Sequence, residues 1–128
     1  MDDVSRHLRR QGFSPRAEYF LASDFLLGYT IETEHFTLTY RQEGPRLILC
    51  DFAAREADGK AVQALLTLVK RTIAAVPSVA HVDAMILAEP GDPALDQARN
   101  RLAQVLLAEG ARPTEINGDL WLRYLCRA

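Results

Sequence analysis

The side chains most able to do nucleophilic or metal chemistry are two cysteines and three histidines. Cys50 ends one predicted strand and His81 begins another, so in neighbouring parallel strands they would lie about 13 Å apart. That distance rules out activation of the thiol by the imidazole, and we interpret Cys50 as a small buried hydrophobic residue. Cys126, His7 and His35 follow no metal-ligand spacing. We therefore predict no catalytic residue and no metal site.

A second candidate chemistry is phosphate binding at the start of the central predicted helix. The stretch from Arg55 to Ala61 resembles the pyrophosphate loop of acetyltransferases, Arg/Gln-x-x-Gly-x-Gly/Ala, where backbone N–H groups and the helix dipole meet phosphates. Gly59 and Ala61 have the matching mutual spacing, but Arg55 comes one residue too early. Glu56 and Asp58 also place two carboxylates where anionic phosphates would lie. We favour a capped helix start with a flexible glycine, and we predict no cofactor.

Basic and aromatic residues favour a protein partner instead. Arg9 and Arg10, with Arg6 and Arg16 nearby, form the one local basic cluster, and arginine suits bidentate and stacking contacts at interfaces. A solvated helix face is the simpler interpretation, since nearly all basic residues of this chain are arginine. Trp121 lies in an apolar run, which core packing explains, with an exposed strip for a partner as the alternative. Our candidate partner-binding residues are Arg9, Arg10, Leu27 and Trp121.

The first half of the chain predicts one helix and a β-meander that must position these residues. A helix spans about Val4–Gln11, with an aspartate before it as a cap and a glycine after it. The following region is poorly patterned as far as Phe25, although it is rich in apolar residues. A strand around Ile31 and the alternating run Phe36–Tyr40 are typical of half-buried strands. Leu47–Cys50 is apolar on both faces, which predicts a central strand covered on both sides.

The second half predicts two helices, a strand and a hairpin. An apolar stripe at helical spacing indicates a helix over Gly59–Val76, and His81–Leu87 indicates the next strand. A strand, a helix and a strand in succession imply a parallel crossover. A second helix begins at Pro93 and ends at Gly110. Asn117-Gly118 predicts a tight hairpin close to the C-terminus.

The expected order is therefore α-β-β-β-α-β-α-β-β in an α/β (α+β) domain. We expect a mixed sheet with an antiparallel meander, a parallel crossover and a C-terminal hairpin, with three helices packed on it. This order resembles the acetyltransferase (GNAT) topology, although such a topology does not establish a function. With 128 residues, of which 48% are hydrophobic and 25% charged, the chain is expected to form a single globular domain over residues 1–128.

Charge and hydropathy exclude several classes of partner. The formal net charge is -2 and the pI about 5.9, which gives no reason to expect a nucleic-acid partner. No apolar run approaches the roughly 20 residues of a membrane-spanning helix. The N-terminus has no apolar stretch of the kind found in secretory signals, so we expect none.

Residues spread along the chain resemble the SseE family of bacterial type III secretion systems. The spacings agree from about Val4 to Leu125, and the LcrR family of secretion regulators is more distantly similar in the last third. The residues that carry the resemblance are Leu8-Arg9-Arg10, Leu27-Gly28, Tyr40-Arg41, Ile48-Leu49-Cys50-Asp51-Phe52, Gly110-Ala111 and Gly118-Asp119-Leu120-Trp121.

The resemblance implies a small accessory protein that binds proteins and catalyses no reaction. Such a protein would act in the bacterial cytoplasm as a chaperone or regulator of translocon secretion, in contact with the secretion apparatus or itself exported. Its partner would be a translocator subunit or the chaperone of one, and a homodimer is a further alternative. The loops Ala53–Lys60 and Pro90–Asp96 depart from the family pattern, so the partner's identity does not transfer. The alternative function is an acetyl-CoA-dependent N-acetyltransferase, degenerate or active.

Overall fold

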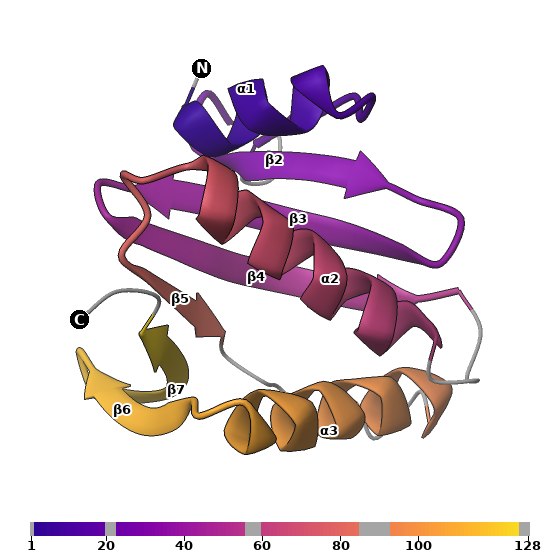
Figure 1. The fold of residues 1–128 in the computed structure, drawn as a ribbon, viewed down its shortest axis with the longest axis vertical. Helices are drawn as coiled ribbons and strands as arrows, with labels where there is room; N and C mark the ends of the chain where they lie inside the picture. The colour runs from indigo at the N-terminus through magenta and orange to yellow at the C-terminus, as the bar shows by residue number, and fades with distance from the viewer. Residues whose placement is uncertain (1, 20–22, 56–59, 85–92, 126–128) are drawn as a thin grey trace.

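The structure, a computed structural model, describes residues 2–19, 23–55, 60–84 and 93–125, except for the side chains of 93–99 and 119–120. The elements in chain order are α1 (Asp3–Arg10), β1 (Arg16–Tyr19), β2 (Leu26–Glu32), β3 (Phe36–Glu43), β4 (Arg46–Ala54), α2 (Lys60–Ala75), β5 (His81–Ala84), α3 (Pro93–Ala108), β6 (Arg112–Ile116) and β7 (Asp119–Leu125). Figure 1 shows the helices arranged around one sheet.

The strands form a mixed sheet in the order β1-β2-β3-β4-β5-β7-β6. All neighbouring pairs are antiparallel except β4 and β5, which run parallel on either side of the crossover through α2. The expected α/β class, with its meander, crossover and hairpin, is confirmed. One strand was missing from the expectation: β1 occupies part of the region that sequence patterning left unassigned. Its four residues are mostly exposed, so no apolar alternation marks it.

Helix α1 begins and ends as its sequence indicates. The Asp2 carboxylate accepts a hydrogen bond from the backbone N–H of Ser5 at 2.7 Å, which caps the first turn. Val4 and Leu8 are buried one turn apart against the sheet. The Ser5 hydroxyl lies 2.7 Å from the Tyr40 hydroxyl, so a buried hydrogen bond ties α1 to β3.

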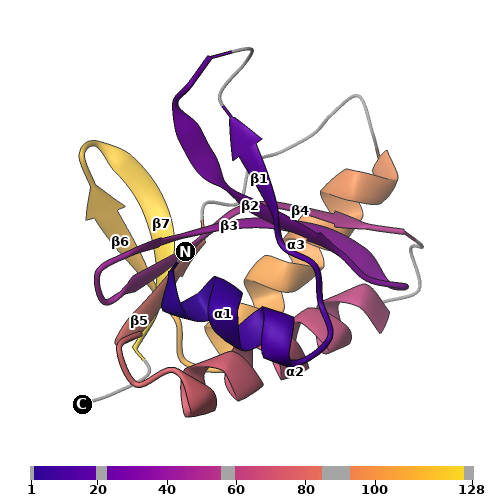
Figure 2. The same cartoon turned by 90° about the horizontal axis from the view of Figure 1, so that it is seen from above.

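Helices α1 and α2 cover the same side of the sheet, as Figure 2 shows. The buried face of α2 includes Val62, Leu65 and Val69, as its apolar stripe predicts. Lys60 and Gln63 lie off this stripe and are exposed. Helix α3 packs beside α2 and contacts β4 and β7, with its Leu102 and Leu106 in the core. The core therefore lies between one face of the sheet and the helices.

A β-bulge in β4 lies at the exposed Cys50. Thr39 of β3 pairs with Asp51, whereas the next residue, Tyr40, pairs with Leu49, so Cys50 is the extra residue. Leu49 and Phe52 both remain buried on either side of it. Cys50 itself is exposed. The prediction of a buried Cys50 is wrong, because it assumed that both faces of this strand are covered, whereas the face on which Cys50 lies is open at this position.

The C-terminal hairpin has the geometry that its turn sequence predicts. Asn117 and Gly118 both have positive φ, 51° and 85°, as a two-residue type I′ turn requires. The turn sets the register Ile116 to Asp119 and, further along, Arg112 to Arg123. On its other side β7 pairs with β5, which places Arg123 opposite Asp83 in the ionic cluster described below.

None of the helices in the described part of the chain is both long and apolar enough to cross a membrane.

Candidate functional site

The four candidate residues from the sequence lie on three different elements and form no common site. Arg9 and Arg10 are exposed in the last turn of α1, where their charges complement the helix dipole. Leu27 is half-buried near the start of β2, and Trp121 is half-buried in β7. Since α1 covers one end of the sheet and β7 lies beyond β5, a single small ligand cannot reach all four.

Trp121 has a defined neighbour on β4. The Arg46 guanidinium carbon lies 5.2 Å from the centre of the Trp121 ring, which is cation–π geometry. The contact joins β4 to β7 across the intervening strand β5. It explains the half-burial of the single tryptophan by packing within the fold.

The same arginine belongs to an ionic cluster that sequence analysis missed. Asp83 of β5 is fully buried, and its carboxylate accepts hydrogen bonds from Arg46 Nε and from Arg123 Nε and Nη2, the last two at 2.8 and 2.9 Å. Burial by itself raises the pKa of Asp83, but the hydrogen bonds from Arg123 and Arg46 outweigh it and hold the pKa below its usual range. The three residues are distant in sequence and meet only through strand register. The cluster links three strands, and we interpret its role as stabilising the sheet.

Apolar side chains gather at the β1–β2 end of the sheet. Tyr19, Phe25 and Leu26 are 51%, 56% and 39% exposed, respectively, and Tyr19 pairs with Leu26 across the two strands. The Arg41 guanidinium carbon lies 5.7 Å from the centre of the Phe25 ring. We call Tyr19, Phe25 and Leu26 the apolar edge. Leu27, one of our candidates, adjoins it in β2.

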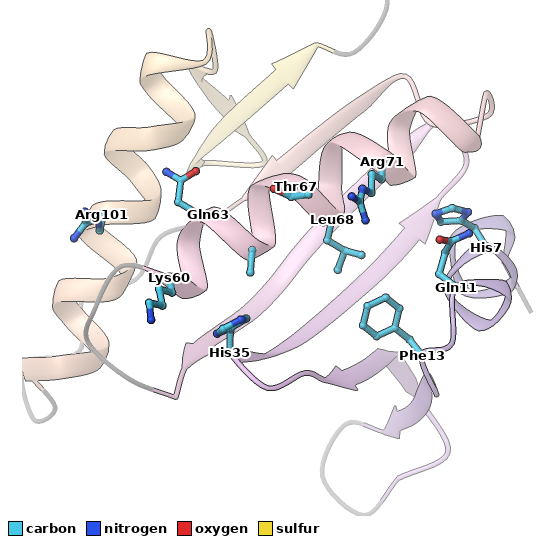
Figure 3. A pocket seen from close by; sticks show the side chains of 11 residues that line it. His7, Gln11, Phe13, His35, Lys60, Gln63, Thr67, Leu68, Arg71 and Arg101 are labelled. Atoms are coloured by element: carbon cyan, nitrogen blue, oxygen red, sulfur yellow. The ribbon is translucent and has the colours of Figure 1, made fainter.

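A groove of about 700 Å³ runs along the outer face of α2. Figure 3 shows side chains of α1 and the segment after it on one flank, with Arg101 of α3 on the other. We call it the α2 groove. Its lining comprises His7, Gln11, Phe13, His35, Lys60, Gln63, Ala64, Thr67, Leu68, Arg71 and Arg101.

Two features of the α2 groove are chemically unusual. Every ionisable residue of its lining within the described segments is basic, although the chain as a whole is slightly acidic. His7 is 5% exposed, and its Nε2 is buried without a hydrogen-bond partner among the described residues. Burial, with a smaller effect of the Arg10 charge, lowers the pKa of His7. Sequence analysis missed the groove, because residues of α1, α2 and α3 that are far apart in sequence line it together, and the arginine cluster of α1 lies outside this lining.

The thiol of Cys50 is poorly suited to nucleophilic chemistry. Partial burial is the main cause that raises its pKa, which favours the unreactive protonated form. His81 pairs with Arg46 in the parallel β4–β5 register, four positions before Cys50 along β4. The expectation that these two residues lie too far apart for a hydrogen bond is confirmed. Cys126 lies outside the described residues.

The acetyltransferase-like stretch is described only at its two ends. Residues 56–59, which include Gly59 and both carboxylates, lie outside the description. Arg55 is exposed and reaches Glu32 at 3.9 Å, while Ala61 is buried in the first turn of α2. Within the described segments, no group of three or more histidine, cysteine or acidic residues is placed to hold a metal ion.

No family model matches the chain, and neither a curated protein nor a solved structure matches it.

Proposed function

We propose that the protein acts by binding another protein, as a cytoplasmic accessory protein of a bacterial type III secretion system. In this role it holds a translocator subunit before export. Two lines of reasoning support the proposal: the co-linear resemblance to the SseE family, and the apolar edge. Translocators carry hydrophobic segments that must be masked before they reach a membrane, so their partner needs an apolar surface to offer.

The apolar edge carries the proposal because it combines exposed apolar side chains with a terminal strand. Among the described strands, β1 is the first in the sheet and pairs with β2 alone. An open strand edge presents unpaired N–H and C=O groups that a partner segment can extend. Strand β6, at the opposite edge, contains Pro113, which lacks an N–H and so weakens that edge as a template. Tyr19, Phe25 and Leu26 add exposed apolar surface at the β1 end.

Co-expression with each translocator subunit encoded beside the gene tests this proposal. Size-exclusion chromatography with light scattering should show a complex whose mass equals the sum of the two chains. Phe25→Ser should weaken the complex at least about tenfold, because it removes most of an exposed aromatic contact. Leu107→Ser is the matched control, since Leu107 is 47% exposed on α3, far from β1 in sequence. A complex that tolerates both variants equally, or the absence of any complex, would contradict the proposal.

The exposed arginines of α1 supply a second contact to probe. Arg9→Glu combined with Arg10→Glu should abolish the complex while leaving the melting temperature close to that of the wild type. Both side chains are exposed, so the fold has little dependence on them. A fall of many degrees would instead make the pair structural. Leu27 and Trp121 are poorer probes, because both are half-buried and their replacement would disturb packing.

An acetyl-CoA-dependent N-acetyltransferase is the second candidate function. The observation that favours it is the parallel β4–β5 pair joined through α2, which places the start of α2 after a central strand. Backbone N–H groups at such a position can meet phosphates. Saturating acetyl-CoA should then raise the melting temperature by several degrees, as any tight ligand of the native state does. Binding by a translocator without any acetyl-CoA effect would exclude this candidate.

A further inference from the structure

The described lining of the α2 groove carries charge of one sign. Several basic side chains elsewhere pair with nearby acids, as Arg6 does with Asp3 and Arg41 does with Glu43. Arg71 projects from α2 beside the groove and forms no ion pair with any residue that the structure describes. Among the residues that the structure describes, no carboxylate belongs to the lining, and these residues give the face a positive potential.

The floor of the groove is apolar where its flanks are basic. Phe13, Ala64 and Leu68 are partly buried and pack against the hydrophobic core. Figure 3 shows Phe13 and Leu68 facing one another across the gap between α2 and the segment that follows α1. A fitting ligand therefore has an apolar face and a negatively charged face.

The length of the groove indicates the size of the ligand. Its lining on α2 runs from Lys60 to Arg71, eleven positions that correspond to about 16 Å along the helix axis. A phosphate-sized anion would occupy only part of this length, whereas about three turns of a helical peptide would fill it. Arg71 lies on α2, and Arg101 adds a positive charge on the far flank.

His7 provides an independent sign that the groove takes a ligand. Its ring lines the groove from α1, and its buried Nε2 has no partner among the described residues. A buried polar atom without a partner is costly, and native proteins contain few of them. An incoming acidic side chain, with a small rotation of the ring, would supply the missing hydrogen bond.

We propose that the α2 groove binds an acidic amphipathic segment of a partner protein. Its apolar side chains rest on Phe13 and Leu68, and its carboxylates face Arg71 and Arg101. This docking mode corresponds to a helix laid in a groove. The inference is independent of the proposed function, because the groove and the apolar edge share no residue.

A synthetic peptide tests the inference directly. The probe is a fluorescein-labelled helical peptide about three turns long, with glutamate on one face and leucine on the other, followed by fluorescence anisotropy at low salt. Arg71→Glu should weaken binding about tenfold or more, because it replaces attraction by repulsion. Arg112→Glu, an exposed arginine of β6 outside the groove, is the matched control and should bind as the wild type does. Arg71→Gln repeats the test without charge reversal, should Arg71→Glu fail to fold.

Further binding experiments distinguish between the possible ligands. A peptide with serine in place of leucine should lose most of its affinity, because the apolar floor is then unused. Equal loss in Arg71→Glu and Arg112→Glu, or no binding of the glutamate–leucine peptide, would overturn the inference. So would groove-dependent binding of inorganic phosphate or of phosphatidylglycerol vesicles with no preference for the peptide. Phe25→Ser should leave peptide binding unchanged, so failure of this inference can be told from failure of the proposed function.

Discussion

At the scale of single residues, the buried carboxylate of Asp83 should dominate the local energetics. It accepts hydrogen bonds from two arginines that belong to the neighbouring strands β4 and β7. Asp83→Asn should destabilise the fold by about 2–4 kcal/mol, because both cations lose their buried counter-charge. This loss is smaller than for a fully buried ion triad, because the side chains of Arg46 and Arg123 are 20% and 28% exposed and can turn toward water. Urea denaturation at neutral pH measures the difference.

The pH dependence of this stability difference tests whether the charge of Asp83 causes it. The pKa of Asp83 is lowered in the folded protein, so its contribution is complete above the unfolded-state value of about 3.9. The contribution disappears as the pH falls through the lower, folded-state pKa. The stability difference between wild type and Asp83→Asn should therefore stay constant near neutrality and shrink only in strong acid. A difference that vanishes already near pH 6 would assign the effect to another group.

His7 should make stability sensitive to mildly acidic conditions. Burial, and to a lesser extent Arg10, lowers the pKa of His7, and Arg71 faces the same groove from α2. Below about pH 6.5 the unfolded chain binds a proton that the folded His7 resists, so stability falls as the pH decreases toward the folded-state pKa. His7→Gln should flatten this dependence, and His35→Gln serves as the control for loss of an imidazole. Thermal denaturation between about pH 5 and 7.5 measures the slope, and an unchanged slope in His7→Gln would refute the assignment.

At the scale of helices, strands and turns, sequence patterning predicted the elements that depend only on neighbouring residues. The stripe of α2 and the Asn117-Gly118 turn each depend on a few neighbouring residues, and both predictions are confirmed. Strand β1 was missed because an exposed edge strand needs no apolar alternation. The exposure of Cys50 was missed because an apolar run does not show where the cover over one face of a strand ends. Strand register assembles the Asp83 cluster, so no sequence motif indicates it.

Strands β2 and β3 approach each other so closely at Gly28 that this position requires a glycine. A Cβ on Gly28 would lie 2.2 Å from the Tyr40 carbonyl oxygen, far inside van der Waals contact. Gly28→Ala should therefore force β2 away from β3 and destabilise the fold by about 3 kcal/mol or more. Gly44→Ala is the matched control: its φ is +57° with open space around it, so strain alone costs about 1 kcal/mol. Equal melting temperatures for the two variants would show that β2 moves freely.

At the scale of the whole molecule, two surfaces of different chemistry stand out. The apolar edge lies at the first strand of the sheet, and the α2 groove lies over the helices. The first suits a hydrophobic segment and the second an acidic one. The candidate site was only partly predictable, because exposure and charge segregation are properties of the folded surface. Of the four residues selected from the sequence, Leu27 adjoins the apolar edge, and Arg10 lies close enough to His7 to affect its pKa.

Hydrogen–deuterium exchange of the chain, alone and with a co-expressed translocator subunit, tests the central claim most directly. In an edge strand, every second amide points away from the only neighbouring strand and exchanges readily. If the translocator extends the sheet at β1, peptides covering Arg16–Tyr19 and Phe25–Leu26 should become protected in the complex. Peptides covering β6 at the opposite edge should exchange as in the free chain. Protection confined to other elements, with β1 and the start of β2 unchanged, would contradict a client-binding role for the apolar edge.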